Sequence, residues 1–112
     1  MKKIEAIIRP SKVSDVCAAL EKVGHPGITI SEIEGHGNQS GMEQEARGKK
    51  YKIGLLNKAR IEVVVNDNDL DKITKTIRET AYTGKVGDGK IFIYSVEDAV
   101  RIRTAEHGNI AV

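Results

Sequence analysis

The hydrophobic positions in the first quarter of the chain predict a strand followed by a helix. Residues 4–8 form a short apolar strand that ends before Pro10, because the residue that precedes a proline is disfavoured in the helical region. The apolar residues that follow recur at helical spacing, with Ser11 as the expected cap and Gly24 as the stop. This stripe consists of Val13, Val16, Cys17, Leu20 and Val23. Cys17 is therefore expected to lie in the core.

The remainder of the chain repeats this order of elements. Strands are predicted at residues 28–34, 61–65 and 91–94, with a last short strand at 100–103. The second helix has the apolar stripe Leu70, Ile73 and Ile77. The order predicts a single α+β domain, residues 1–112, with a ferredoxin-like βαββαβ sandwich in which both helices cover one face of a four-stranded sheet. The other face of the sheet must also be covered, and association with further copies of the chain would cover it. We therefore expect a homo-oligomer.

A segment from residue 35 to about 58 shows neither helical nor alternating periodicity. Loops longer than about 12–15 residues are uncommon in compact domains and are usually functional or disordered. Tyr51 stands among charged residues in this loop, where an exposed tyrosine can anchor a partner or be modified. The plain alternative is a solvated surface loop of mixed charge.

Composition narrows the class of protein. The 112 residues are 39% hydrophobic and 30% charged, with a formal net charge of +2, which is typical of one globular domain and favours neither nucleic acid nor membrane as a partner. A single cysteine excludes an internal disulfide or a thiolate zinc site within one chain and favours a reducing, cytoplasmic setting. No window approaches the roughly 18 apolar residues of a membrane-spanning helix, so we expect a soluble protein.

A glycine-rich segment is the strongest candidate for chemistry. Residues 83–90 read Thr-Gly-Lys-Val-Gly-Asp-Gly-Lys, and such loops let backbone N–H groups and a lysine approach a phosphate. The segment is not a Walker A loop, because Ile91 replaces the magnesium-binding hydroxyl and the order runs from helix to strand. Arg101 and Arg103, two apart on the predicted last strand, would share one face and add positive charge for a polyphosphate. The alternative for the glycines is an ordinary turn between a helix and a strand. The alternative for the two arginines is a solvent-exposed edge strand whose charges discourage pairing with another chain.

These residues carry a resemblance to a known family. The run Thr-Gly-Lys-Val-Gly-Asp-Gly-Lys-Ile-Phe-Ile at 83–93 resembles the C-terminal signature of the PII nitrogen-regulatory signal proteins. The opening ten residues and Arg-Ile-Arg-Thr at 101–104 match the same family, and the likeness extends over essentially the whole chain. The resemblance implies a regulatory homotrimer, not an enzyme, that binds ATP or ADP between its subunits and senses 2-oxoglutarate.

The resemblance also implies the site residues. The residues that match the family's nucleotide-binding positions are Ile7, Thr29, Asn38, Glu62, Val64, Thr83, Gly87, Asp88, Gly89, Lys90, Arg101 and Arg103. The residues that match the family's 2-oxoglutarate-binding positions are Gly37, Gln39, Gly41, Lys58 and Gly87. Gln39 would also bind the Mg²⁺ ion that accompanies ATP. The segments concerned are the T-loop at 35–58, the phosphate loop at 82–90 and the C-terminal segment 101–112.

The long loop departs from the family pattern. Ala46 and Lys49 differ from the modification signature, although Tyr51 is present as a candidate for uridylylation, and Asn38 stands where many members have an arginine. The loop is expected to dock on an ammonium transporter, a nitrogen-assimilation enzyme or a nitrogenase-related protein.

Two other classes of function compete with the sensor. An enzyme that hydrolyses nucleotide or transfers a phosphoryl group would use the same glycine-rich loop, but no Walker B carboxylate accompanies it. An RNA-binding module shares the topology, but residues 61–65 lack the aromatics that stack on bases.

Overall fold

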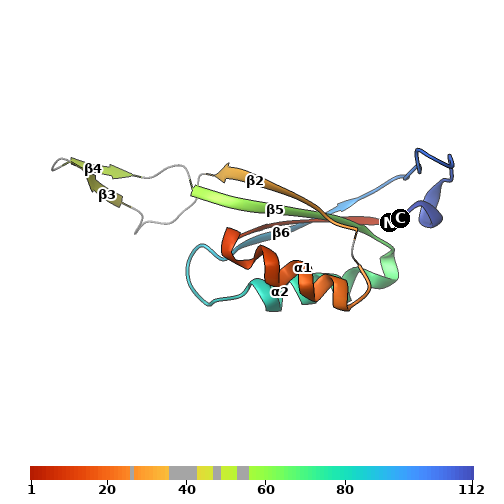
Figure 1. Ribbon diagram of the computed structural model, residues 1–112, viewed down its shortest axis with the longest axis horizontal. Helices are drawn as coiled ribbons and strands as arrows, with labels where there is room; N and C mark the ends of the chain where they lie inside the picture. Colours follow the sequence, from red (N-terminus) through yellow and green to blue (C-terminus); the bar gives the residue numbers. More distant parts are fainter. Residues whose placement is uncertain (26, 36–42, 47–48, 53–55) are drawn as a thin grey trace.

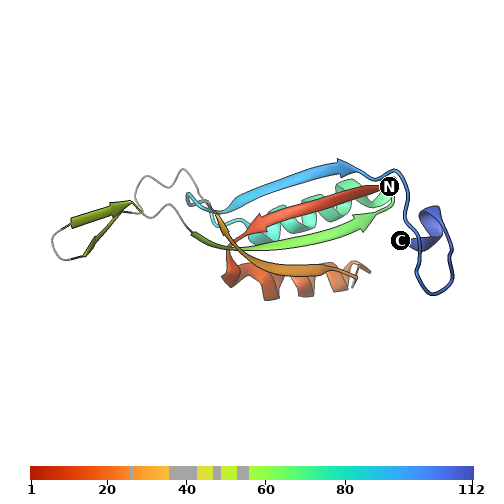
Figure 2. The same ribbon diagram turned by 90° about the horizontal axis from the view of Figure 1, so that it is seen from above.

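The computed structural model confirms the ferredoxin-like arrangement. It describes residues 1–25, 27–35, 43–46, 49–52 and 56–112, with only the backbone of 35, 43–46, 49–52 and 56. One antiparallel sheet has the order β2-β5-β1-β6, formed by β2 (Thr29–Gly35), β5 (Leu56–Val65), β1 (Lys2–Ile8) and β6 (Gly89–Ser95). The helices α1 (Val13–Lys22) and α2 (Leu70–Ala81) both lie on one face of this sheet (Figure 1). Seen from above, β2 and β6 form its two edges (Figure 2).

The core lies between the sheet and the helices. Alternate residues of β1 and β5 point toward the helices and are buried, as the period of two in a strand requires. The fully buried large side chains are Ile4, Ile8, Val16, Leu20, Ile61, Val65, Ile73 and Ile77. At about 25 cal/mol per Å² of apolar area, burying each of them stabilises the fold by roughly 1.5–3 kcal/mol before entropic costs. The predicted helix stripes therefore form the helix side of the core.

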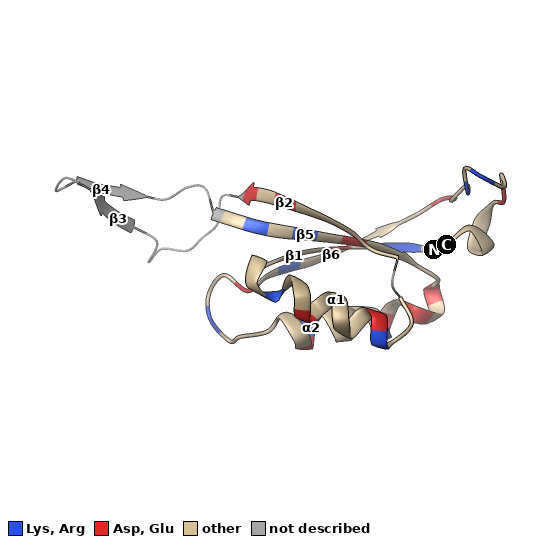
Figure 3. Ribbon diagram, in the orientation of Figure 1, with Lys and Arg blue, Asp and Glu red and all other residues tan. Residues whose placement is uncertain are grey.

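The opposite face of the sheet is open in the single chain. Lys3, Glu5 and Ile7 of β1 point to this face, and they are half-buried by their cross-strand neighbours. On β6, Phe92 and Tyr94 are about half exposed. Basic and acidic positions are interspersed along the sheet and helices (Figure 3).

Four local expectations were wrong or incomplete. Ser11 does not cap the first helix but lies inside a 3₁₀ turn, η1 (Pro10–Lys12), and α1 begins at Val13 with no side-chain cap. Cys17 is only half-buried, because it lies at the flank of the helix stripe, and partial burial raises the pKa of its thiol. β5 begins at Leu56, so Lys58 belongs to a strand.

The fourth difference concerns the C-terminal segment. Residues 100–103 do not form a strand: Val100 makes an isolated bridge to His107, and a turn follows it. The argument that Arg101 and Arg103 leave one strand face therefore fails. The segment ends in a short 3₁₀ turn, η3 (Gly108–Ala111).

A short hairpin lies within the segment for which no periodicity was found. β3 (Glu43–Ala46) pairs with β4 (Lys49–Lys52) in a separate two-stranded sheet.

A third 3₁₀ turn, η2 (Asp67–Asp69), leads into α2. Among the described residues, no helix is long and apolar enough to cross a membrane.

Candidate functional site

Asp88 organises the glycine-rich loop that follows α2. Its carboxylate accepts hydrogen bonds from the backbone N–H groups of Thr83 and Gly84, at 2.8 and 2.9 Å, and from the Thr83 hydroxyl. Arg9 donates to the same carboxylate at 3.1 Å through Nε. The Thr83 hydroxyl is the main cause that lowers the pKa of Asp88 well below its usual range, and the backbone N–H groups and Arg9 add to it. Asp88 is therefore a carboxylate that shapes the loop.

The glycines of this loop are required by its backbone. Gly84, Gly87 and Gly89 all have positive φ, at +87°, +102° and +104°. A Cβ on Gly89 would lie 1.7 Å from the carbonyl oxygen of Ile7, because β6 begins there against the end of β1. The number of glycines therefore follows from the turn itself and is not by itself a sign of phosphate binding.

Basic side chains converge on this end of the sheet. Lys58 Nζ donates to the Gly87 carbonyl oxygen at 2.7 Å, and an Arg9 guanidinium nitrogen donates to the Val86 carbonyl oxygen at 2.8 Å. Burial lowers the pKa of Lys58, the nearby Arg9 lowers it further, and Asp88 opposes both effects. Lys58 and Gly87, far apart in sequence, thus come together as a 2-oxoglutarate site would need.

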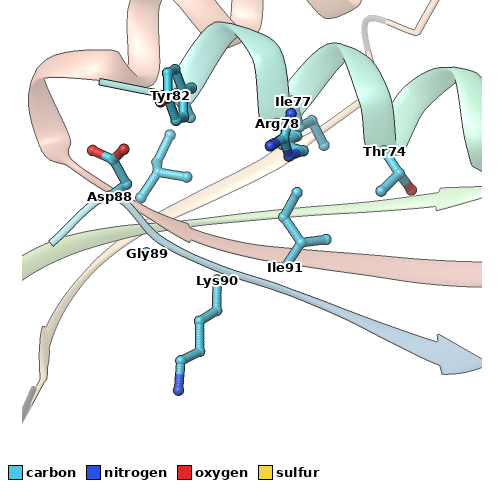
Figure 4. Close-up of a pocket in the computed structure, with 10 residues that line it drawn as sticks. Thr74, Ile77, Arg78, Tyr82, Asp88, Gly89, Lys90 and Ile91 are labelled. Carbon is cyan, nitrogen blue, oxygen red and sulfur yellow. The ribbon is translucent and has the colours of Figure 1, made fainter. Parts of the chain in front are cut away.

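Lys90 follows the loop and points the other way. Its side chain leaves β6 on the face opposite α2 (Figure 4). Lys90 on β6 pairs with Ile7 on the neighbouring strand β1. These two residues, both expected at the nucleotide, therefore lie side by side on the open face of the sheet. A phosphate that reached Lys90 would approach from this open face and not from the helices.

The residues expected around adenosine form a second group. Thr29 and Glu62 are cross-strand partners, and together with Val64 they line a cavity of about 460 Å³. Lys3 and Val112 line the same cavity.

Charges hold Glu62 in place within this cavity. Lys3 Nζ lies 2.5 Å from one oxygen of the Glu62 carboxylate, and Arg60 Nε lies 3.4 Å from the other. The hydrogen bond from Lys3 is the main cause that lowers the pKa of Glu62. Glu62 is therefore an ionised acceptor beside Thr29.

Arg101 belongs to a separate turn at the C-terminal end. Its guanidinium donates to Glu106 at 3.1 Å and to the Ile110 carbonyl oxygen at 2.9 Å. Asp98 anchors the same turn by accepting from the N–H groups of Ala99 and Gly108 and by pairing with the His107 ring at 2.8 Å. Arg103 lies on the exposed part of the turn.

The two groups of site residues do not meet within one chain. Gly89 pairs with Ile8 at one end of β1, whereas Val64 pairs with Lys3 near the other end. Five residue steps of strand separate these positions, which is about 17 Å. The C-terminal turn extends beyond the second end, away from the glycine-rich loop (Figure 1). Of three cavities formed by described residues, none is lined by both groups.

Several predicted residues lie outside the described part of the chain. These are Gly37, Asn38, Gln39 and Gly41. Tyr51 lies in β4, for which the backbone alone is described.

Sequence reasoning missed two residues that hold the site together. Arg9 supports the glycine-rich loop from 79 residues away, and Lys3 pairs with Glu62 across the sheet. The only signal for Arg9 was its position at the end of the first strand, directly before Pro10. Both contacts depend on strand pairing, which local patterns do not specify.

Comparison with known proteins decides the family. The family model described as Nitrogen regulatory protein P-II matches residues 1–106. The chain belongs to the P-II family. It is 52% identical, over its full length and 97% of the relative, to Nitrogen regulatory protein P-II 2 of Methanothermobacter thermautotrophicus. It is 48% and 49% identical, over the full length of both chains, to Nitrogen regulatory protein P-II of Pasteurella multocida and of Haemophilus influenzae.

Membership of the P-II family fixes the broad role. P-II proteins are regulatory signal-transduction proteins that act by interacting with target proteins, and they are not enzymes. The chain is therefore a nitrogen-regulatory protein, and the competing interpretation as a nucleotide-hydrolysing or phosphotransfer enzyme is wrong.

Proposed function

We propose that this P-II protein senses ATP, ADP and 2-oxoglutarate and regulates a target protein through residues 35–58. The observation that carries the proposal is the meeting of Lys58 and Arg9 with the loop that contains Gly87 and Asp88. These groups come from three separate parts of the sequence, and they place two cations against a loop of fixed shape. A loop with two cationic side chains beside it is suited to anions.

The phosphates of the nucleotide would be held by Gly87, Gly89 and Lys90. The N–H groups of Thr83 and Gly84 already donate to Asp88, so the second half of the loop is the part that faces a ligand. Positive φ at Gly87 and Gly89 is compatible with a close approach of an anion to the backbone. Thr83 and Asp88 would then position the loop from behind.

The nucleotide would lie between subunits of a homotrimer. Thr29, Glu62 and Val64 line a cavity that does not include the glycine-rich loop, and the C-terminal turn, which carries Arg101 and Arg103, lies beyond the opposite end of the sheet from that loop (Figure 1). A second copy that brought its cavity and its arginines to this loop would complete one site. The open face of the sheet, which carries Ile7, Phe92 and Tyr94, would provide the surface for that association.

The second ligand, 2-oxoglutarate, would join Lys58 to the T-loop. In this proposal Gln39 holds Mg²⁺ together with ATP, and 2-oxoglutarate completes the metal sphere while its carboxylate contacts Lys58. The Lys58 ammonium already lies at Gly87, so one small dianion would link the long loop to the nucleotide site. The ligand would thereby select among conformers of residues 35–58.

The proposed target is an ammonium transporter, a nitrogen-assimilation enzyme or a nitrogenase-related protein. Tyr51 would be the residue available for uridylylation. We also place the protein in the cytoplasm, which the single cysteine supports. Pull-downs from nitrogen-shifted cells, with ATP, ADP or 2-oxoglutarate added in turn, would identify the target by its ligand-dependent capture.

Calorimetry tests the sensor. Wild-type protein should bind ATP and ADP, and 2-oxoglutarate should bind only when Mg²⁺ and ATP are present. Lys90→Ala should weaken ATP binding, while Lys75→Ala on the exposed side of α2 should not. No binding at millimolar ATP would refute the proposal.

Mixed oligomers test the placement between subunits. Lys90→Ala and Arg103→Ala chains should each bind ATP poorly as homo-oligomers. Co-expressed and purified through two different tags, they should regain a fraction of tight sites, because an intact loop then meets an intact C-terminal segment. A site built within one chain would show no recovery on mixing.

A further inference from the structure

Lys3 has no role in the functions proposed above, although it lines the cavity that also contains Thr29 and Glu62. Of the described residues that line this cavity, only Lys3, Thr29 and Glu62 have polar side chains. The rest of the lining is small or aliphatic: Gly27, Val63, Val64, Ala99, Ala111 and Val112. A cavity of about 460 Å³ with this lining suits a flat, largely apolar ring that carries one polar edge.

Two carboxylates face each other across β1 and β5 beside this cavity. Glu5 is the direct cross-strand partner of Glu62, and like charges at such positions repel each other. Without a cation, Glu62 would therefore favour rotamers that move its carboxylate away from Glu5. Lys3 supplies that cation, because its Nζ lies 2.5 Å from Oε2 of Glu62. The hydrogen bond to Glu62 is the main cause that raises the pKa of Lys3, and the charge of Glu5 adds to it.

Tyr94 holds Lys3 from the strand on the other side. The two residues are cross-strand partners on β6 and β1, and Nζ of Lys3 lies 5.4 Å from the centroid of the Tyr94 ring. A cation at this distance from an aromatic face is attracted to it. The Tyr94 hydroxyl in turn donates to Oε2 of Glu5 at 3.3 Å. Lys3 is thus held by a carboxylate on one neighbouring strand and by an aromatic ring on the other.

Glu62 is thereby fixed between two cations and still has acceptor capacity for a ligand. Arg60 Nε lies 3.4 Å from Oε1 of Glu62 and also donates to the Ser31 hydroxyl at 3.3 Å. Because each carboxylate oxygen can accept about two hydrogen bonds, neither oxygen is saturated by its cation. An ionised carboxylate accepts but does not donate, so the ligand must present a donor. Adenine presents a donor at its 6-amino group, whereas guanine and hypoxanthine have a carbonyl oxygen there.

We propose that Lys3 is a positioning residue that fixes the Glu62 carboxylate as the acceptor for the 6-amino group of adenine. The proposal rests on the proposed function, since it takes ATP or ADP as the ligand, and it adds the contact by which the cavity selects the base. A 6-carbonyl oxygen placed against the ionised Glu62 would be repelled and would leave the carboxylate without its hydrogen bond. Sites built to bond a polar group discriminate strongly against analogues that lack it.

Calorimetry with ATP and inosine triphosphate tests the base selection, because the two ligands differ only at this edge of the ring. The wild type should prefer ATP by about a hundredfold or more. Lys3→Met should reduce this preference about tenfold by weakening ATP binding alone, the size expected for one hydrogen bond to a charged group. Lys3→Arg, which keeps the charge, should restore it. Lys2→Met is the matched control, because Lys2 neighbours Lys3 on β1, bonds to Ser95 and does not line the cavity.

A merely structural role of Lys3 would lower both affinities together and leave their ratio unchanged. The ratio therefore separates positioning from general destabilisation. Glu62→Gln gives a second variant, since an amide can donate to a carbonyl oxygen as well as accept from an amine. It should also reduce the preference for ATP. A full preference in Lys3→Met, or in Glu62→Gln, would overturn the proposal.

A carbon NMR titration of Glu62 in the ligand-free protein gives a readout that does not depend on nucleotide binding. Lys3→Met should raise the pKa of Glu62 toward its usual value, because Lys3 is the main cause of the lowered pKa, and Lys2→Met should not. An unchanged pKa in Lys3→Met would overturn the positioning role. Equal binding of ATP and inosine triphosphate by the wild type would overturn the base selection and leave the sensor intact. A wild type that binds neither nucleotide would refute the proposed function and the base selection together.

Discussion

Replacing Gly89 by alanine should destabilise this protein more than any other glycine substitution in the described sheet and loop. Gly89 has φ +104°, and an added Cβ would lie 1.7 Å from the Ile7 carbonyl oxygen and 2.8 Å from its carbon. Real Cβ contacts essentially never fall under 3.0 Å, so the backbone of β6 must move away from β1. No flexible side chain can yield in its place, because the obstacle is backbone.

The magnitude follows from two costs. A left-handed φ costs an L-residue about 1–2 kcal/mol. Moving the start of β6 weakens the Ile8–Gly89 end of the β1–β6 ladder, and each lost hydrogen bond costs about 0.5–1.5 kcal/mol. With one ladder hydrogen bond lost, the two costs together predict a loss of about 1.5–3.5 kcal/mol in the free energy of unfolding.

Matched glycines separate the two costs. Gly108 has φ +76° with nothing within 4 Å, so Gly108→Ala should cost only the conformational strain of about 1–2 kcal/mol. Gly27 has neither a positive φ nor a close neighbour, so Gly27→Ala should be neutral or slightly stabilising, by about 0.4–1 kcal/mol. Urea unfolding followed by circular dichroism, at one fixed protomer concentration, gives the three values. If Gly89→Ala loses no more stability than Gly108→Ala, the contact with Ile7 is not what requires glycine here.

Four further predictions follow from individual contacts. Asp88→Asn should weaken ATP binding in calorimetry, whereas Asp71→Asn should not. Because the folded-state pKa of Asp88 is lowered, its contribution to the free energy of unfolding is complete above a pH of about 4 and is lost as the pH falls from there toward the folded pKa; an unfolding free energy with the same pH dependence below about 4 in Asp88→Asn and in the wild type would contradict its role. Lys58→Ala should reduce 2-oxoglutarate binding in the presence of Mg²⁺ and ATP, with partial recovery in Lys58→Arg, and equal affinities for all three proteins would exclude a charge contact. Ile61→Ala should cost about 2–5 kcal/mol in urea unfolding, against almost nothing for Lys75→Ala, and a small loss for Ile61→Ala would show that the core is not packed as described. His107→Ala should raise the pKa of Asp98 toward its usual value in a carbon NMR titration, since the His107 ring is the main cause of the lowered pKa. An unchanged pKa would show that His107 does not act on Asp98.

Local patterns were enough to predict the helices and strands of the main fold and the family. The apolar stripe of the second helix became its buried face, with Ile73 and Ile77 in the core. The glycine-rich loop was located correctly, and its signature indicated the family that the comparison then confirmed. These features depend on spacing within a few residues, which the sequence displays directly.

Errors arose where long-range pairing or a local turn overrode the pattern. The alternation at 100–103 predicted a strand, but Arg101 bonds to Glu106 and Ile110 within a turn instead, and none of the described strands pairs with this segment. Cys17 belongs to the helical stripe, yet at its flank it is only half-buried. The glycine count, which favoured phosphate binding in the sequence, is explained in the structure by three positive φ values.

The sequence alone therefore determined the two helices, the four strands of the main sheet and the family, and it predicted which residues would hold a phosphate. The tertiary structure decided which of these residues meet. Antiparallel pairing of β1 with β6 brings Ile7 to Lys90, and contacts between distant segments bring Lys58 to Gly87 and Arg9 to Asp88. The same pairing separates Val64 from Gly89 by most of the length of β1. Spacing along the chain carries no information about such separations, because they are set by strand register across the sheet.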